Sequence, residues 1–231
     1  MSIRLFGNVP HCIAMKEIIP PLILACCFLA LFGLAESLYR FGKVRAEWTR
    51  KIVHMGTGLL TLLFPVVLIS HWQVLFLCAS FLVILLASLK FGWLPSINAI
   101  DRFSYGSILF PVIVYALFLV FQMADRGLIV FYLPILVLAI CDPVAALVGK
   151  RFPFGKYQVM GGGKSAAGSL AFFASALLVT AVTVSTFNDV HSGMLLVVLV
   201  PAVATISEAL GVKGMDNFTI PASVVLTLCL I

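Results

Sequence analysis

The chain has 231 residues, of which 62% are hydrophobic and 10% charged, with a formal net charge of +6 at neutral pH. Soluble domains carry roughly 25% charged residues, so a core of this size could not hide so much apolar surface from water. The composition excludes a soluble globular domain and predicts a polytopic membrane protein. Because the basic residues sit in short loops between apolar runs, the positive charge does not indicate a nucleic-acid partner.

Apolar runs that could cross a bilayer recur along the whole chain. A spanning helix needs about 20 apolar residues, and candidate runs occupy residues 18–38, 52–70, 72–89, 108–122, 128–148, 166–186, 194–210 and 218–231. The fourth is short, and the last has 14 residues, so it would be re-entrant or stop at an interface. We therefore expect an all-α transmembrane bundle of seven or eight spans, formed by residues 18–231 as a single domain after a short tail at 1–17.

Neither a cleavable signal nor a cysteine framework is expected. The tail carries Arg4, Lys16 and Glu17, and the apolar run after it is long enough to span, with no small-residue cleavage site. The six cysteines lie mostly inside apolar runs, without CxxC or Cys/His ligand spacing. The sequence gives no indication of the oligomeric state.

Basic residues are concentrated in alternate loops, which predicts an orientation. Of the 15 lysines and arginines, 12 lie in or beside the first, third, fifth and seventh loops: Arg40, Lys43, Arg45, Arg50, Lys51, Lys90, Arg102, Lys150, Arg151, Lys156, Lys164 and Lys213. The positive-inside rule then puts these loops in the cytoplasm and the N-terminus outside. We expect a multi-pass protein of the cell (inner) membrane. Its loops that carry candidate functional residues would face the cytoplasm, which holds nucleotides.

The first loop leads into a span with two cations and an imidazole. On a helix, Arg50 and His54 share a face and Lys51 borders it, an arrangement that would suit a nucleotide or pyrophosphate. The alternative is that both cations flank the membrane and reach lipid head groups. His54 could be a general base or simply hydrogen-bonded to a backbone carbonyl. Gly56 and Gly58, two residues apart, are typical of helix packing.

Asp142 stands inside the fifth apolar run, where a carboxylate costs about 2.5–3.5 kcal/mol to insert and indicates a functional site. Asp is a favoured N-cap and Pro a favoured first helical residue, so Asp142-Pro143 predicts that the run breaks near Cys141 and a short second helix begins. Broken helices are tolerated where they line a cavity. If the helix instead continues, small residues share the face of Asp142, allowing a second helix or a ligand to approach: Ala145, Ala146 and Gly149.

The loop at residues 150–164 is basic and glycine-rich. It carries four cations, of which the last is Lys164; three consecutive glycines at 161–163 precede Lys164-Ser165, and Gly168-Ser169 follows. Glycines let backbone N–H groups converge on phosphate, and a lysine adds charge. A flexible connector is the alternative. The loop is not a Walker A motif, since Gln158 stands where that motif requires glycine.

Further polar residues occur late in the chain. Glu208 is a second intramembrane carboxylate, and Asp216-Asn217 opens the last run. A cluster of Asp142, Glu208 and Asp216 would suit a Mg²⁺ ion that bridges nucleotide phosphates, because hard cations take oxygen ligands.

Taken in order, these residues resemble the dolichol kinase / phytol kinase family of polytopic lipid-alcohol kinases, which also includes a CTP-dependent diacylglycerol kinase. The resemblance covers residues ~36–225 and rests on four motifs: Arg50-Lys51-x-x-His54, Asp142-x-x-Ala145-x-x-x-Gly149-Lys150-Arg151-Phe152, Lys164-Ser165-x-x-Gly168-Ser169 and Asp216-Asn217-x-Thr219-Ile220-Pro221. The segment from Asp142 to Ser169 is also similar to the end of the phosphatidate cytidylyltransferases. One position departs from the family pattern, because Ala167 stands where a glutamate is common.

The resemblance implies transfer of a phosphoryl group from CTP to a lipid alcohol with Mg²⁺. Asp142, Arg50 and Lys51 would be catalytic. Nucleotide or phosphate binding would fall to Arg50, Lys51, His54, Gly149, Lys150, Lys164, Ser165 and Gly168. Metal binding would fall to Asp142, Asp216, Glu208 and Asn217. The alcohol (phytol, farnesol, dolichol or another polyprenol, or diacylglycerol) would enter between helices from the membrane lipids.

Two other functions stay open from the sequence. A phosphatidate cytidylyltransferase-like enzyme would make a CDP-lipid and release pyrophosphate, whereas a kinase releases CDP. A transporter would be expected to show inverted repeats with a broken helix in each half, and the sequence suggests one break, at Asp142.

Overall fold

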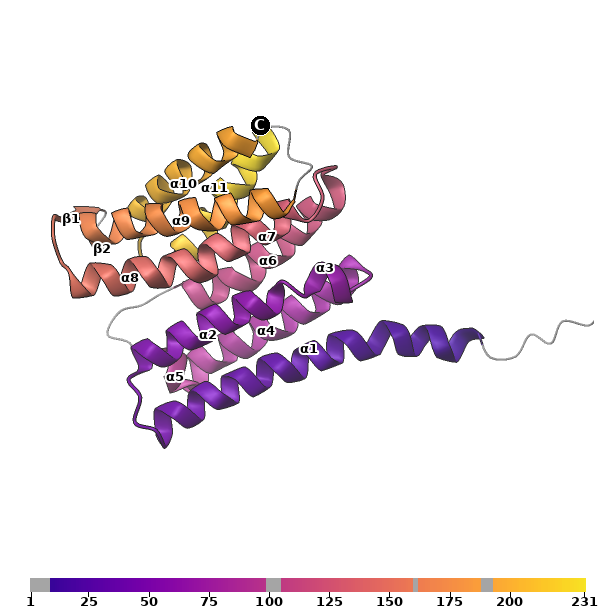
Figure 1. Cartoon of the computed structure of the whole chain (residues 1–231). Helices are drawn as coiled ribbons and strands as arrows, with labels where there is room; N and C mark the ends of the chain where they lie inside the picture. Colours follow the sequence, from indigo (N-terminus) through magenta and orange to yellow (C-terminus); the bar gives the residue numbers. More distant parts are fainter. Residues whose placement is uncertain (1–8, 99–104, 160–161, 188–192) are drawn as a thin grey trace, which may run out of the picture.

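The computed structural model describes residues 9–98, 105–159, 162–187 and 193–231. Helices make up most of these residues (Figure 1). In chain order the elements are α1 (Val9–Arg40), α2 (Ala46–Thr61), α3 (Phe64–Val67), α4 (His71–Phe91), α5 (Pro95–Asn98), α6 (Gly106–Met123), α7 (Ile129–Leu136), the π-helical segment η1 (Val137–Cys141), α8 (Asp142–Arg151), the strands β1 (Lys156–Val159) and β2 (Gly162–Ser165), α9 (Ala166–Thr186), α10 (Gly193–Leu210) and α11 (Asp216–Leu230).

The predicted polytopic bundle is confirmed. Among the described residues, seven helical stretches are long and apolar enough to cross a membrane, and the predicted run 166–186 coincides with α9. The second run divides into α2 and α3, and the fifth comprises α7, η1 and α8. The last run is α11, whose 15 residues reach about 22 Å at the rise of a helix, short of the ~30 Å hydrocarbon core. Its residues Ile220, Val224 and Leu228 are buried within the bundle.

The first helix begins earlier than the sequence predicts. Residues 9–17 of the predicted tail are helical and continue into α1, because Lys16 and Glu17 are a short polar interruption between apolar residues and do not stop a helix. Residues 1–8, including Arg4, and Arg102 lie outside the described residues.

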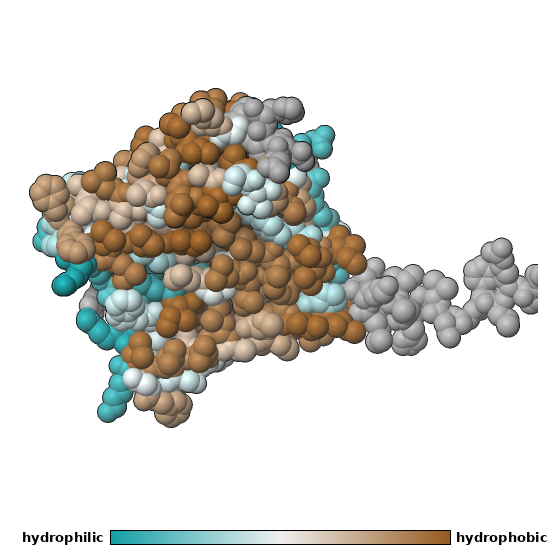
Figure 2. Space-filling model, viewed as in Figure 1, coloured by the Kyte–Doolittle hydropathy of each residue, from teal (hydrophilic) through white to brown (hydrophobic). Residues whose placement is uncertain are grey.

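The helix formed by α7 and η1 is the centre of the bundle. Its side chains at Val130, Phe131, Leu133, Ile135 and Val137 have no exposed surface. Around it, α9 packs against α8 and α10, α10 packs against α11, α4 against α6, and α1 against α2. The space-filling view shows hydrophobic surface over the helix sides and hydrophilic residues gathered at the left end, where Figure 1 places the α1–α2 turn and the β1–β2 hairpin (Figure 2).

The predicted helix break at Asp142 is wrong. The backbone of Asp142 is helical, with φ −63° and ψ −48°, and Cys141 before it is helical too. Instead, the π turn of η1 accommodates Pro143, so that the helix continues past it. In a π register the carbonyl of Leu138 would accept from the N–H of residue 143, which proline lacks. That carbonyl accepts a hydrogen bond from His54 Nε2 at 3.1 Å, so the helix continues without an unpaired acceptor.

The basic loop after α8 forms a small antiparallel hairpin. Lys156 pairs with Ser165, and Val159 pairs with Gly162, where strand β2 begins. Two of the three glycines expected to form a phosphate-binding turn, Gly162 and Gly163, therefore lie in a strand, and Gly161 falls outside the described residues. The hairpin places Lys164 just before the N-terminus of α9, so backbone pairing between the strands fixes the position of Lys164.

Gly58 sets the distance between α2 and the central helix. A Cβ added there would lie 2.5 Å from the Cβ of Ala139 in η1. We expect Gly58→Ala to lower the free energy of unfolding by about 1–3 kcal/mol through overpacking. The free energy of unfolding would be measured in detergent or bicelles. Adding Ala139→Gly to Gly58→Ala should restore that stability. Gly33→Ala is the control, because nothing lies within 4 Å of that added Cβ. A loss at Gly33 equal to that at Gly58 would contradict this interpretation.

Candidate active site

Two adjoining cavities open at the hairpin end of the bundle and share one wall. They measure about 420 and 590 Å³, and both are lined by Asp142, Ala146, Lys150 and Asp216. The first extends to α2 and carries Arg50, Lys51 and His54. The second extends to the hairpin and carries Lys164, Ser165, Gly168 and Glu208. The structure thus brings residues from four distant parts of the chain to one polar site.

Positive charge exceeds negative charge around these cavities. Among the described residues, seven lysines and arginines and four carboxylates line the walls: Arg45, Arg50, Lys51, Lys150, Lys156, Lys164, Lys213, Glu47, Asp142, Glu208 and Asp216. A cleft lined by one sign of charge raises the local concentration of ligands of the opposite sign. The site therefore suits an anionic ligand with several phosphates.

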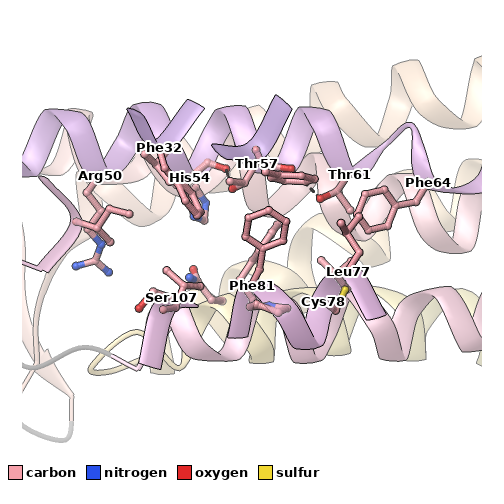
Figure 3. A pocket seen from close by; sticks show the side chains of 18 residues that line it. Phe32, Arg50, His54, Thr57, Thr61, Phe64, Leu77, Cys78, Phe81 and Ser107 are labelled. Carbon is pink, nitrogen blue, oxygen red and sulfur yellow. Dashed lines mark hydrogen bonds between the residues drawn. The ribbon is translucent and has the colours of Figure 1, made fainter. Parts of the chain in front are cut away.

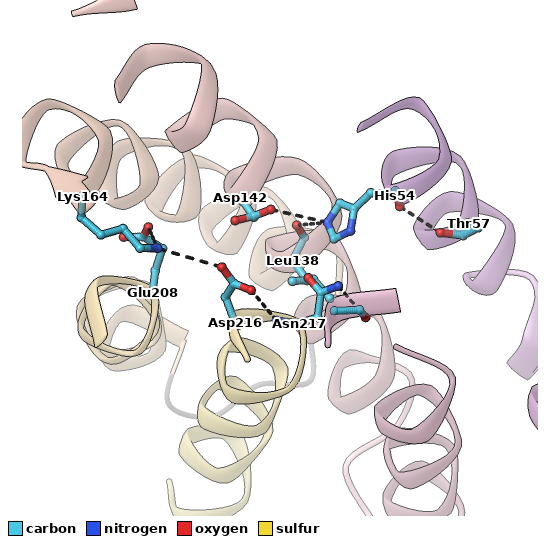
Figure 4. Close-up of polar contacts among 9 residues, drawn as sticks. His54, Thr57, Leu138, Asp142, Lys164, Glu208, Asp216 and Asn217 are labelled. Carbon is cyan, nitrogen blue, oxygen red and sulfur yellow. Dashed lines mark hydrogen bonds and ion pairs between the residues drawn. The ribbon is translucent and has the colours of Figure 1, made fainter. Parts of the chain in front are cut away.

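Asp142 and His54 lie next to each other in the wall of the first cavity (Figure 4). His54 Nε2 lies 3.1 Å from the carbonyl oxygen of Leu138 and 3.8 Å from Asp142 Oδ2. A carbonyl oxygen can only accept, so Nε2 carries the proton. This contact matches the structural interpretation of His54 given by the sequence. Nε2 is therefore not available as a general base, and the ring instead presents an N–H edge beside the carboxylate.

Lys164 joins two carboxylates on the other side of Asp142. Its Nζ lies 2.5 Å from Glu208 Oε1 and 4.0 Å from Asp216 Oδ2 (Figure 4). Glu208 Oε2 also accepts a hydrogen bond from Ser169 at 3.3 Å, and Ser169 lies 2.7 Å from the Tyr157 hydroxyl. Glu208 is buried, with its side chain 5% exposed. The expected phosphate-binding lysine thus also neutralises a buried acid.

The predicted cluster of three metal-binding carboxylates does not form as such. Within the part of the chain that the structure describes, no three His, Cys, Asp or Glu side chains lie close enough to hold a metal ion by themselves. Glu208 is engaged by Lys164, because opposite charges pair when buried. Asp142 and Asp216 still border both cavities. Mg²⁺ is usually held by one or two carboxylates together with water and substrate phosphates, so this donor pair fits such an ion.

Asn217 serves the packing of the site. Its Nδ2 donates to the backbone oxygen of Gly106 at 2.8 Å, and its side chain is buried. A Cβ at Gly106 would lie 2.7 Å from that nitrogen, so the contact needs glycine in α6. The amide therefore fixes α11 to α6 and holds Asp216, the preceding residue, at the cavity.

Ser165, Gly168 and Gly149 make the contact between α8 and α9. Ser165 Oγ accepts from Gly168 N at 3.2 Å and caps α9. A Cβ at Gly149 would lie 2.8 Å from the same Oγ, so the small-residue face of α8 receives a second helix at this point. All three residues line the second cavity. Ala167, where the family pattern has glutamate, lines neither of the two cavities.

The cations of the first cavity differ in their surroundings. Lys51 Nζ lies 5.5 Å from the ring centre of Trp48, a cation–π contact. Lys150 pairs with Glu47, which links α8 to α2 across the mouth. Arg50 lines the cavity wall and also a neighbouring apolar cavity.

Sequence reasoning missed three polar residues of the site. Tyr157 and Ser169 hold the Glu208 side of the network, and Glu47 holds Lys150. A signal existed for Ser169, which belongs to the Gly168-Ser169 pair of the third motif. Tyr157 and Glu47 sit in polar loop sequence, where nothing distinguishes them from solvated residues.

Comparison with known proteins supports one family. No family model matches the chain, and no solved structure matches it. The chain is 35% identical over 205 residues to a phytol kinase of Synechocystis sp., an alignment that covers 86% of this chain and 85% of that protein. The match extends over nearly the whole length of both proteins. The chain therefore belongs to the phytol kinase family.

Proposed function

We propose that the protein is a membrane kinase that transfers the γ-phosphoryl group of CTP to the hydroxyl of a lipid alcohol, phytol or a similar isoprenoid. The observation that carries the proposal is that seven lysines and arginines line the two adjoining cavities that Asp142 and Asp216 border. The relative in Synechocystis sp. is named a phytol kinase, and the apolar helices put such an alcohol within reach from the bilayer.

Phosphoryl transfer depends mainly on positioning and charge neutralisation. Arg50, Lys51 and Lys150 offer that charge from the α2 and α8 walls, and Lys164 offers it from the hairpin. His54 borders Asp142 and, through its hydrogen bond to the Leu138 carbonyl, would hold that part of the helix in place. These residues would hold the triphosphate against the wall that both cavities share, where the alcohol's hydroxyl has to arrive.

We further propose that Asp142 and Asp216 hold Mg²⁺. When bound, the ion would neutralise charge on the phosphate oxygens. The two carboxylates come from α8 and from the start of α11, and both border the two cavities; the Asn217 contact with Gly106 fixes α11 to α6. The seventh loop would thus complete the site formed by the first and fifth.

The orientation that the basic loops predict fits this function. The α1–α2 turn, the hairpin and the α10–α11 turn all reach the cavities. We propose that this end faces the cytoplasm of a cell whose inner membrane holds the protein, since CTP is a cytoplasmic nucleotide.

The test is a panel of nucleotides and alcohols on the purified protein in nanodiscs. We expect phosphorylated phytol to form with CTP and Mg²⁺, at a rate at least about tenfold above the rate with ATP, GTP or UTP. Mass spectrometry of the lipid and chromatography of the nucleotide would measure both products. Transfer of CMP to the alcohol with release of pyrophosphate, or no product from any alcohol beside an active control kinase, would refute the proposal.

A further inference from the structure

Two phenylalanines at the hairpin end of the bundle lie on its outside. Within the bundle, Phe32, Phe64 and Phe81 line a cavity of about 80 Å³, and all three side chains are buried (Figure 3). Phe152 and Phe154, which follow the end of α8, are instead 61% and 78% exposed. Phenylalanine normally contributes a large buried apolar area. Two exposed rings in one turn therefore indicate an apolar environment outside the bundle.

This turn is fixed to the start of α9. The backbone oxygen of Gly155 accepts from Ala166 N at 2.9 Å, and that of Phe154 accepts from Ala167 N at 3.4 Å. Phe154 N donates to the backbone oxygen of Phe152 at 2.8 Å. Gly155 has φ +62°, and a Cβ there would lie 2.8 Å from the Cβ of Ala166, so glycine is needed for this close approach. The backbone contacts thus hold both rings on the outside.

The turn lies at the level of a membrane surface. The helical stretch Ile129–Arg151 has 23 residues, which give a length of about 34 Å at the rise of a helix. A hydrocarbon core is ~30 Å thick, so the end of α8 and the turn after it reach the head-group region. Leu147, on the same face of α8 as Arg151, is exposed too. Figure 2 shows hydrophobic beside hydrophilic side chains at this end.

A cation accompanies the two rings. Arg151 Cζ lies 5.9 Å from the ring centre of Phe152, a cation–π contact. Lys150 and Lys156 line the polar cavities, whereas Arg151 lines neither of them. A segment that combines exposed aromatic rings with Lys or Arg binds at a membrane interface through its apolar area and its attraction to anionic lipids. The charge and the exposed rings together match an anionic phospholipid.

We propose that Phe152 and Phe154 insert into the head-group region of the membrane at the hairpin end, where Arg151 binds the phosphate of an anionic phospholipid. Strand β1 follows the turn and pairs with β2, which carries Lys164. The anchor would therefore hold the hairpin at the membrane surface. This inference goes beyond the proposed function and does not depend on it.

Photo-crosslinking of the full-length protein tests the proposal. p-Benzoylphenylalanine would replace Phe154 in nanodiscs made of phosphatidylglycerol and phosphatidylcholine, and mass spectrometry would identify the lipids attached to it. We expect lipid adducts in which phosphatidylglycerol exceeds its share of the disc. Arg151→Gln should lower the ratio of phosphatidylglycerol to phosphatidylcholine adducts about fivefold, the attraction of one cation to an anionic surface.

Three controls accompany this experiment. The same probe at Val83, 64% exposed on the outside of α4, should also attach to lipid. At Gln158, an exposed residue of β1 that lines the second polar cavity, it should attach to little lipid. Arg126→Gln removes an exposed cation from the turn between α6 and α7 and should leave the adduct ratio at position 154 unchanged.

Three results would overturn the proposal. They are no lipid adduct at position 154 while Val83 gives one, cross-linking of position 154 to a second polypeptide, and adducts in the proportions of the disc that Arg151→Gln does not change. If Arg151→Gln did not fold, the adduct ratio with Arg151 in place would decide alone. No catalytic activity is measured, so failure of the proposed function would leave this test unaffected.

Discussion

Replacing Asp142 by asparagine is expected to lower kcat for phosphoryl transfer by at least about 10²-fold, the scale found when one preorganised electrostatic group is removed. Asp142 borders both polar cavities and lies 3.8 Å from His54 Nε2. Asparagine keeps the shape of the side chain and loses its charge, so the helix continues while the proposed Mg²⁺ site loses an anionic ligand. Steady-state CTP turnover in nanodiscs measures the effect, and the melting temperature reports on folding.

Asp125→Asn is the matched control for this experiment. Asp125 is an exposed carboxylate in the turn between α6 and α7, and it lines none of the cavities described above. We expect its kcat to equal that of the wild type. Wild-type turnover by a folded Asp142→Asn protein would remove Asp142 from the catalytic site.

Breaking the Lys164–Glu208 pair is expected to destabilise the fold. Lys164→Met leaves Glu208, 5% exposed, without its cation, and removing one partner of a buried pair costs about 3–5 kcal/mol. We expect a loss at the lower end of this range, about 3 kcal/mol, because the Lys164 side chain is 20% exposed and water screens its charge. Unfolding in detergent, followed by helix content, measures the loss.

A double variant separates the structural role of Lys164 from its chemical one. Adding Glu208→Gln to Lys164→Met removes the buried charge and leaves an amide that can still contact Ser169, so most of the lost stability should return. Activity should stay low, because the second cavity has lost Lys164, the cation nearest to Asp216 among the ion pairs described. If the losses of stability caused by Lys164→Met alone and by Glu208→Gln alone add in the double variant, the Lys164–Glu208 pair does not form.

The sequence predicted the bundle well because hydrophobic length alone decides where a chain can cross a bilayer. The α9 boundaries match those predicted, and the basic loops meet at one end of the bundle. The error at Asp142 arose from a rule of soluble helices, in which Asp-Pro starts a helix. In this chain a π turn accommodates Pro143, which has no N–H to donate. His54, far away in sequence, donates to the Leu138 carbonyl in its place.

The candidate site was only partly predictable for a similar reason. The polar residues stand out because lipid makes them costly, and those from four segments do converge. Their pairing depends on distances that no local pattern contains. From the sequence, Lys164 could pair with Asp142, Glu208 or Asp216. The packing of α9 against α10 places it beside Glu208. The glycines of the basic loop belong partly to a strand because residues 156–159 supply a pairing partner.

The most direct test of the central claim follows the label from CTP with phytol as acceptor. With CTP labelled at the γ-phosphate, we expect the label to enter the lipid and CDP to form in equal amount, and we expect Asp142→Asn to lower the rate of both at least about 10²-fold. With CTP labelled at the α-phosphate, the lipid should stay unlabelled. Label from the α-phosphate in the lipid, accompanied by pyrophosphate, would contradict the account and make the protein a cytidylyltransferase.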